Sequence, residues 1–79
     1  MRRDPRPTLV LTFHTTAAAM QTQRACAEEG IPGRLFPVPR QLSSDCGIAW
    51  ASDPADRPRL EELIAEKLLE PAEIVELTL

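Results

Sequence analysis

Two cysteines are the residues of this chain best placed to do chemistry, and their surroundings differ. Cys46 lies in the polar run Ser43-Ser44-Asp45-Cys46-Gly47, where a buried apolar side chain is not expected. Cys26 falls at helical spacing with alanines, on what would be the inner face of a helix, where a cysteine behaves as a small hydrophobic residue. We therefore interpret Cys26 as structural. Cys46 is a candidate nucleophile, because the thiolate is the reactive form of cysteine.

The spacing of the cysteines argues against a disulfide framework and against structural zinc. They stand 20 positions apart, with a single histidine in the chain and no CxxC pair. Two cysteines do not make the disulfide framework of a small secreted protein, and a cytosolic compartment keeps them reduced. A structural zinc site takes four ligands, commonly from closely spaced cysteine pairs. The sequence therefore predicts no metal site.

Length and charge describe a small acidic domain. The 79 residues are 43% hydrophobic, which is enough for one core but leaves no room for a large enclosed active site. The net charge of −3 gives no electrostatic attraction to nucleic acid. The apolar stretch 9–13 is too short for a signal peptide or a membrane span. We therefore predict a cytoplasmic protein with neither nucleic acid nor a membrane as its partner.

The first half of the chain predicts a strand followed by a helix. Residues 8–13 are apolar and rich in β-branched side chains, as in a strand. A helix from Ala17 to about Glu29 follows, with Thr15 or Thr16 as its N-cap and Gly30 as its left-handed C-terminal residue. Its small inner face would pack closely on a sheet, and consists of Ala18, Ala19, Thr22, Ala25 and Cys26.

The second half predicts two strands, a helix and a last strand. Segment 34–39 contains two prolines and therefore belongs at a sheet edge, whereas the apolar segment 47–51 belongs in the middle, with Trp50 in the core. A helix capped by Asp53 or Asp56 and stopped by Pro71 comes next, and segment 75–79 then alternates as a strand. The inner stripe of this helix is predicted to contain Leu60, Leu63, Ile64, Lys67 and Leu68.

This order of elements predicts an α+β fold of ferredoxin-like βαββαβ type over residues 8–79. Right-handed crossovers then give a four-stranded antiparallel sheet in the order 4-1-3-2, with two helices on one face. The proline-containing strand falls at the edge of this sheet and the apolar third strand in the middle, in agreement with their residues. Residues 1–7 form a basic, proline-containing start, which we predict to be a flexible arm.

The predicted topology brings distant polar residues together. The first and third strands are antiparallel neighbours, so the exit of one at His14 lies beside the entrance of the other at Cys46. The positive end of the first helix and the loop that carries Arg40 lie at the same edge and favour a thiolate, although Asp45 opposes it. Gly47 leaves room beside the sulfur for a ligand. His14 could instead be a hydrogen-bonded structural residue, and Arg40 a solvated loop charge.

Three segments of the chain resemble a known family. Residues 13–18, 31–40 and 43–49 are similar to the small bacterial proteins of the selenium/sulfur carrier-like family. The most specific features are the Pro-Val-Pro-Arg segment and the Ser-Ser-x-Cys-Gly turn that follows it. The resemblance covers most of the chain, and it maps the family's cysteine onto Cys46 and its Pro-Arg pair onto Pro39 and Arg40. It implies a carrier rather than an enzyme.

The leading hypothesis is therefore a carrier that holds sulfur or selenium on Cys46 as a persulfide or selenopersulfide. The donor would be a cysteine desulfurase-like enzyme and the acceptor another enzyme of sulfur or selenium metabolism, with no cofactor beyond the covalently bound atom. Arg40 and the helix start at Thr15 and Thr16 would stabilise the anion, with Gly47 leaving access and His14 moving the proton.

Three other hypotheses remain open. The first is a non-catalytic interaction or regulatory module, whose open sheet face and edge strands could pair with a second copy as a homodimer. The second is delivery of a soft metal, which requires a second ligand at the first loop, where the chain has His14 and no cysteine. The third is RNA binding, although the central strands lack the interleaved aromatic and basic residues of an RNA-recognition sheet.

Overall fold

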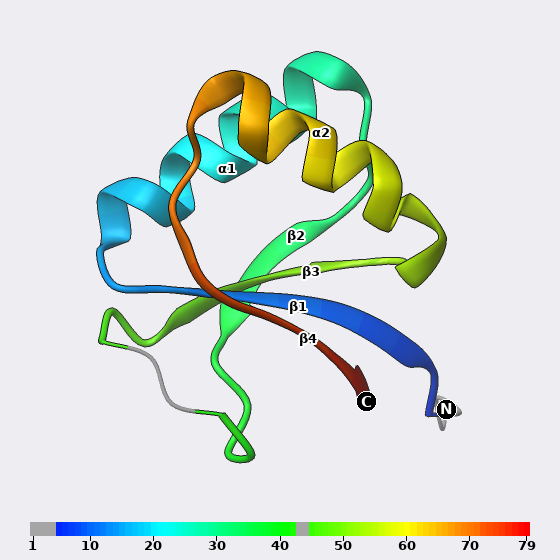
Figure 1. The fold of residues 1–79 in the computed structure, drawn as a ribbon. Helices are drawn as coiled ribbons and strands as arrows, with labels where there is room; N and C mark the ends of the chain where they lie inside the picture. Colours follow the sequence, from blue (N-terminus) through cyan, green and yellow to red (C-terminus); the bar gives the residue numbers. More distant parts are fainter. Residues whose placement is uncertain (1–4, 43–44) are drawn as a thin grey trace.

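A four-stranded antiparallel sheet carries two helices on one side in the computed structural model, which describes residues 5–42 and 45–79 (Figure 1). Its elements, in chain order, are β1 (Pro7–Phe13), α1 (Thr16–Glu29), β2 (Arg34–Pro37), β3 (Ile48–Ser52), the 3₁₀ turn η1 (Pro54–Asp56), α2 (Arg57–Lys67) and β4 (Pro71–Thr78). The sheet order β2-β3-β1-β4 is the predicted 4-1-3-2 read from the other edge. The predicted α+β fold is therefore confirmed.

The register of β1 against its two neighbours fixes the sheet. Thr12 lies opposite Ala49 of β3 on one side and opposite Glu73 of β4 on the other. Proline has no backbone N–H to donate to a neighbouring strand. The prolines of β2 and β4 therefore suit the edge positions of these two strands. β4 begins at Pro71, four residues earlier than the predicted strand start, because the β1 ladder continues along it as far as Phe13.

The two ends of the described chain are paired with each other. The backbone N–H of Arg6 donates to the carbonyl of Leu79 at 2.8 Å, and the N–H of Leu79 donates back to the carbonyl of Arg6 at 2.9 Å. The β1–β4 pairing thus continues beyond Pro7 to Arg6. Residues 1–4 of the predicted arm lie outside the described residues.

Helix α1 begins and ends as its sequence indicates. The hydroxyl of Thr15 accepts a hydrogen bond from the backbone N–H of Ala18 at 3.1 Å, as an N-cap does. Gly30 ends the helix with φ +71°, a left-handed conformation that glycine adopts without a Cβ clash. The predicted inner face is confirmed in full, since its buried residues are Ala18, Ala19, Thr22, Ala25 and Cys26.

Helix α2 differs from its predicted stripe at the C-terminal end. Leu60 and Leu63 are buried as predicted, but Leu68 is 79% exposed and Lys67 is also exposed. The prediction was wrong for these two because the helix ends at Lys67, and Leu68 then turns left-handed at φ +54°. That turn removes residue 68 from the helical stripe, and Leu69 is buried instead.

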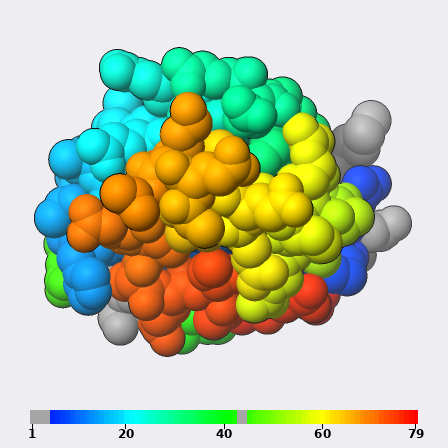
Figure 2. Space-filling view, turned by 45° about the horizontal axis from the view of Figure 1, so that its top comes forward, coloured from blue at the N-terminus to red at the C-terminus, as the bar shows by residue number. Residues whose placement is uncertain are grey.

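Both helices cover one face of the sheet, where they lie side by side (Figure 2).

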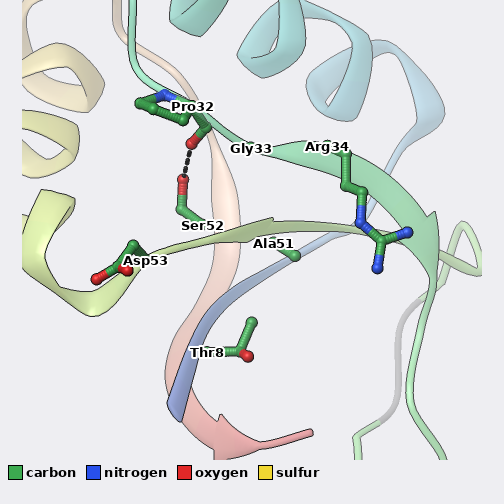
Figure 3. Close-up of a pocket in the computed structure, with 7 residues that line it drawn as sticks. All are labelled: Thr8, Pro32, Gly33, Arg34, Ala51, Ser52 and Asp53. Carbon is green, nitrogen blue, oxygen red and sulfur yellow. Dashed lines mark hydrogen bonds between the residues drawn. The ribbon is translucent and has the colours of Figure 1, made fainter. Parts of the chain in front are cut away.

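The Trp50 side chain, which is 3% exposed, is held near the start of β2 by two hydrogen bonds. Its Nε1–H donates to the hydroxyl of Ser52 at 3.1 Å. That hydroxyl donates in turn to the carbonyl of Pro32 at 2.7 Å (Figure 3). A Cβ at Gly33 would overlap the indole ring of Trp50 and the carbonyl oxygen of Ala51. Only glycine therefore lets the chain pass this close to β3.

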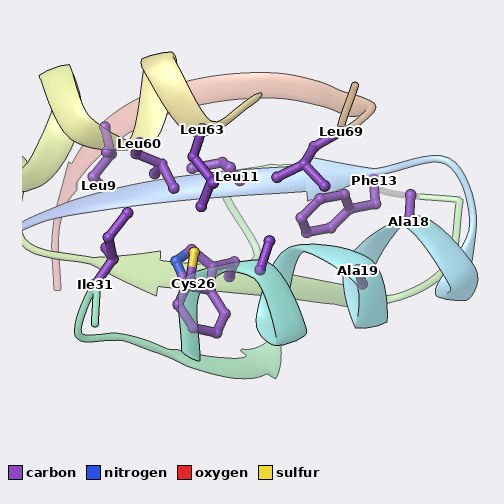
Figure 4. Close-up of a cluster of buried hydrophobic side chains, with 12 residues drawn as sticks. Leu9, Leu11, Phe13, Ala18, Ala19, Cys26, Ile31, Leu60, Leu63 and Leu69 are labelled. Carbon is purple, nitrogen blue, oxygen red and sulfur yellow. The ribbon is translucent and has the colours of Figure 1, made fainter. Parts of the chain in front are cut away.

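The hydrophobic core lies between the sheet and the two helices. Side chains from β1, α1 and α2 point toward one another there (Figure 4). Phe13, Leu11 and Leu60 are among the largest of the fully buried side chains, and Cys26 belongs to the same cluster. One of the two cysteines, Cys26, is therefore enclosed between the helices and the sheet.

Candidate functional site

One end of the sheet gathers the residues that the topology was predicted to bring together. Thr12 and Ala49 are cross-strand neighbours, so the chain leaves β1 at His14 beside the point where it enters β3 after Cys46. Helix α1 also starts at this end, with Thr16 as its first residue. The end of β1, the entrance to β3 and the start of α1 lie at one end of the fold (Figure 1), as expected for the convergence of His14, Cys46 and the helix start.

The loop between β2 and β3 is closed at its base by the backbone. The N–H of Val38 donates to the carbonyl of Gly47 at 3.1 Å, which extends the β2–β3 pairing beyond Pro37. Arg40 lies exposed in the turn that follows, where the N–H of Leu42 donates to the carbonyl of Pro39 at 3.0 Å. Arg40 and Cys46 therefore belong to one closed loop. Ser43 and Ser44 of the same loop lie outside the described residues.

Cys46 is half-buried at the edge of the core. Its Sγ lies 3.4 Å from the carbonyl oxygen of Ile48, toward which the thiol donates, and its side chain packs against the core cluster. Gly47 follows with φ +75°, and a Cβ there would meet no atom within 4 Å. Access to the Cys46 sulfur past Gly47 stays a prediction. Glycine is needed at this position for its backbone conformation.

Asp45 has a role that the sequence did not indicate. Its Oδ2 lies 2.7 Å from Nδ1 of His14, and both side chains are largely exposed, at 71% and 72%. A carboxylate only accepts hydrogen bonds, so Nδ1 of His14 carries the hydrogen and Nε2 is the other ring position for a proton. Asp45 was predicted only to oppose a thiolate. Thirty-one positions separate the two residues, and only the pairing of β1 with β3 brings them together.

The other predicted residues occupy the helix start. The hydroxyl of Thr15 is engaged with the N–H of Ala18, so its direct role is to cap α1. Thr16 is exposed in the first turn, at the end of the helix that carries partial positive charge. The structure thus gives Thr15 a positioning function and leaves Thr16 at the surface.

Cys26 has a different environment. It is fully buried on the inner face of α1, and burial raises the pKa of its thiol to about 11. A thiol in apolar surroundings resists ionisation, because the thiolate would lose its hydration. Burial thus favours the protonated thiol of Cys26, the environment expected of a structural cysteine.

Comparison with known proteins shows the family of this chain. The family model described as putative Se/S carrier protein-like matches residues 8–76, which include both strands of the site and Cys46. The chain belongs to this family. No curated protein sequence is significantly similar to the chain. Among the described residues, this member of the Se/S carrier-like family has no helix long and apolar enough to cross a membrane.

Proposed function

We propose that this protein carries sulfur or selenium on Cys46, as a persulfide or selenopersulfide, between a donor enzyme and an acceptor enzyme. The observation that carries the proposal is the position of Cys46, half-buried at the end of the sheet where α1 begins and within the residues that match the family. A carrier needs a reachable sulfur and an open surface. The second cysteine is enclosed in the core and is unsuited to that role.

Loading is a thiol exchange in which no net oxidation occurs. The Cys46 thiolate attacks the terminal sulfur of a persulfide on a donor cysteine, and a new sulfur–sulfur bond forms. The bond between that terminal sulfur and the donor cysteine breaks, and the donor leaves as a thiolate. Unloading is the same exchange with an acceptor thiolate as the attacking group. A selenopersulfide follows the same steps with selenium as the transferred atom.

The neighbouring residues have separate roles in this proposal. Arg40, on the loop that carries Cys46, and the start of α1 are the positive groups that we assign to stabilise the sulfur anion formed during the exchange. His14, with its Nδ1–H held by Asp45, accepts or returns a proton at Nε2. Gly47, which has no side chain, is assigned the role of leaving room for a partner beside the sulfur. Thr15 holds the helix start in place, with Thr16 beside it.

The test is transfer from a cysteine desulfurase supplied with L-cysteine, followed by intact mass spectrometry. We expect the parent protein and Cys26→Ala to gain the mass of one sulfur atom, and Cys46→Ser to gain none. Asp45→Asn and His14→Gln should load more slowly, by roughly tenfold or more, because general acid–base groups contribute at least that much. Substituting L-selenocysteine for L-cysteine tests whether selenium is carried.

Loading of Cys46→Ser at the parent rate would refute the carrier function. A parent protein that gains no sulfur at all would favour the non-catalytic interaction module, which needs no reactive thiol.

A further inference from the structure

Leu68, the turn residue between α2 and β4, has two properties that do not stabilise the fold. Its side chain is 79% exposed, the largest exposed fraction among the large hydrophobic residues of the described chain. Its backbone is left-handed at φ +54°, a conformation that is unfavourable for a residue with a Cβ and that glycine adopts freely. No other non-glycine residue of ranges 5–42 and 45–79 has a positive φ. An exposed leucine in a strained turn indicates a contact outside the chain.

The turn at Leu68 lies at the end of the sheet that also carries Cys46. Pro71 begins β4 opposite the last residue of β1. The next residue of the chain after β1, His14, is hydrogen-bonded to Asp45, which precedes Cys46. Figure 1 shows the chain running from the end of α2 to β4 on the side where α1 begins. A protein that reaches Cys46 therefore approaches the end of the molecule where Leu68 is exposed.

Two adjoining hollows connect this turn with the outer side of α1. The first, of about 520 Å³, has Met20 and Arg24 among its lining residues. The second, of about 200 Å³, lies between α1 and the end of α2 and is lined in part by Lys67 and Leu69. Gln21 and Arg24 line both, so the hollows form one continuous surface, and Figure 2 shows the end of α2 against α1. We call it, with Leu68 at its rim, the helix-end surface; its residues are Met20, Gln21, Arg24, Lys67 and Leu68.

The helix-end surface combines apolar side chains with positive charge. Met20 is 50% exposed, so this surface holds two of the three exposed large hydrophobic side chains of the described residues. The third, Leu79, follows β4 at the opposite end of the sheet. The charged residues that line the two hollows are Arg24 and Lys67, which are positive, and Glu28, which is negative. On a chain of net charge −3, this surface therefore suits a partner with an apolar pocket bordered by carboxylates.

We propose that the donor enzyme of the sulfur transfer docks on the helix-end surface, with Leu68 as the apolar anchor of the contact. The proposal rests on the proposed function, because only a sulfur carrier requires a donor. A standard interface covers about 800 Å² on each partner, an area roughly 30 Å across. The two shorter dimensions of the chain are 26 and 19 Å. One donor can therefore contact Leu68 and reach Cys46 at the same time.

The rate at which a cysteine desulfurase loads Cys46, measured by intact mass over a range of desulfurase concentrations, tests the docking. Leu68→Asp should raise the desulfurase concentration needed for half the maximal rate by roughly tenfold or more, because a charge then enters an apolar contact. The maximal rate should not change, since the variant leaves Cys46 and its neighbours untouched. The matched control is Leu79→Asp, the same change at the opposite end of the sheet, which should load like the parent.

Glycine at residue 68 separates docking from folding. Leu68→Gly removes the anchor and also the steric cost of the left-handed turn, so the midpoint of urea unfolding should rise. The desulfurase concentration for half the maximal rate should rise as it does in Leu68→Asp. A leucine that served only the turn would change the unfolding midpoint and leave loading unchanged. Met20→Gln, which keeps the length of the side chain and suits a helix, should weaken loading several-fold.

A small persulfide gives the control for the chemistry of the thiol. Glutathione persulfide transfers its terminal sulfur to Cys46 by the same exchange and leaves as the glutathione thiolate. It has no protein surface with which to dock, so the parent, Leu68→Asp and Leu68→Gly should load at equal rates. A loss of loading that appears only with the desulfurase therefore belongs to docking.

Two results would overturn the docking proposal alone. Parent-like loading of both Leu68 variants by the desulfurase would mean that the donor docks on other residues. The same slowing with glutathione persulfide as with the enzyme would mean that Leu68 acts on the thiol itself. A parent that gains sulfur from neither donor would refute the carrier function as well. Failure of the docking surface is thus distinguishable from failure of sulfur transfer.

Discussion

The two cysteines of this chain have the same side chain in two different environments. Cys26 belongs to the buried cluster between the helices and the sheet, and Cys46 packs against the outside of the same cluster. One is fully buried on the inner face of α1, and the other is half-buried where a loop enters β3. Both contact the same core, so the difference that we expect in their reactivity arises from exposure to water and from polar neighbours.

The largest expected difference is in the rate of alkylation of the folded protein. Iodoacetamide near neutral pH should modify Cys46 at least about a hundredfold faster than Cys26, because a buried amide or thiol reacts only when the structure opens. The thiol of Cys26 also has a pKa raised to about 11 by burial, which keeps it protonated. Intact mass against time, measured on Cys26→Ala and Cys46→Ser, gives the two rates.

In concentrated denaturant both cysteines should react at similar rates, which is the control for the intrinsic reactivity of each thiol. Equal alkylation rates in the folded protein would contradict the predicted difference in reactivity, because they would mean that α1 does not shield Cys26.

The second expected difference is in stability at alkaline pH. Burial raises the pKa of Cys26 from 9.0, the value for an exposed thiol, to about 11 in the folded chain. Below pH 9.0 both the folded and the unfolded state hold the proton. Above it the unfolded state loses its proton first, so stability falls as pH rises toward 11. The loss is on the order of 3 kcal/mol. Cys26→Ala should lack this part of the loss.

Urea unfolding of the parent and of Cys26→Ala at several pH values between about 8 and about 11 measures the difference. The chain suits this experiment because it contains no tyrosine and a single lysine, so few other groups titrate in the window. Parallel stability curves for the two proteins would show that Cys26 is reached by water in the folded state.

The sequence predicted the fold because local and global signals agree. Small residues at helical spacing around Cys26 specify a face that packs closely, and all of them are buried. Two prolines assign β2 to an edge before any pairing is considered. The antiparallel neighbours β1 and β3 then bring His14 and Cys46 to one end. Each of these predictions concerns backbone conformation or strand pairing, which sequence patterns indicate well.

The sequence was less informative where a side chain depends on one backbone angle or on a distant partner. Leu68 is at helical spacing with the core residues of α2, yet its left-handed backbone turns it to solvent. No sequence rule favours leucine over glycine at such a position. From the sequence, Asp45 was expected only to oppose a thiolate at Cys46. Its hydrogen bond to His14 could not be predicted, because it depends on how the segment after β1 and the segment before β3 lie against each other.

The smallest expected effect separates two glycines, one near each cysteine. Gly30 ends the helix that carries Cys26, and Gly47 follows Cys46. Their φ values are +71° and +75°, and an added Cβ at either would have no atom within 4 Å beyond its neighbours in the chain. Alanine should therefore cost about 1 kcal/mol of unfolding free energy at each position, because of the left-handed backbone alone.

The rate of sulfur loading should distinguish the two variants. Gly47→Ala should slow loading several-fold, whereas Gly30→Ala should leave it unchanged. Urea unfolding and desulfurase-driven loading on the same samples measure both effects. Equal loading by the two variants would mean that Gly47 serves only the turn into β3 and that access to Cys46 lies on another side of the sulfur.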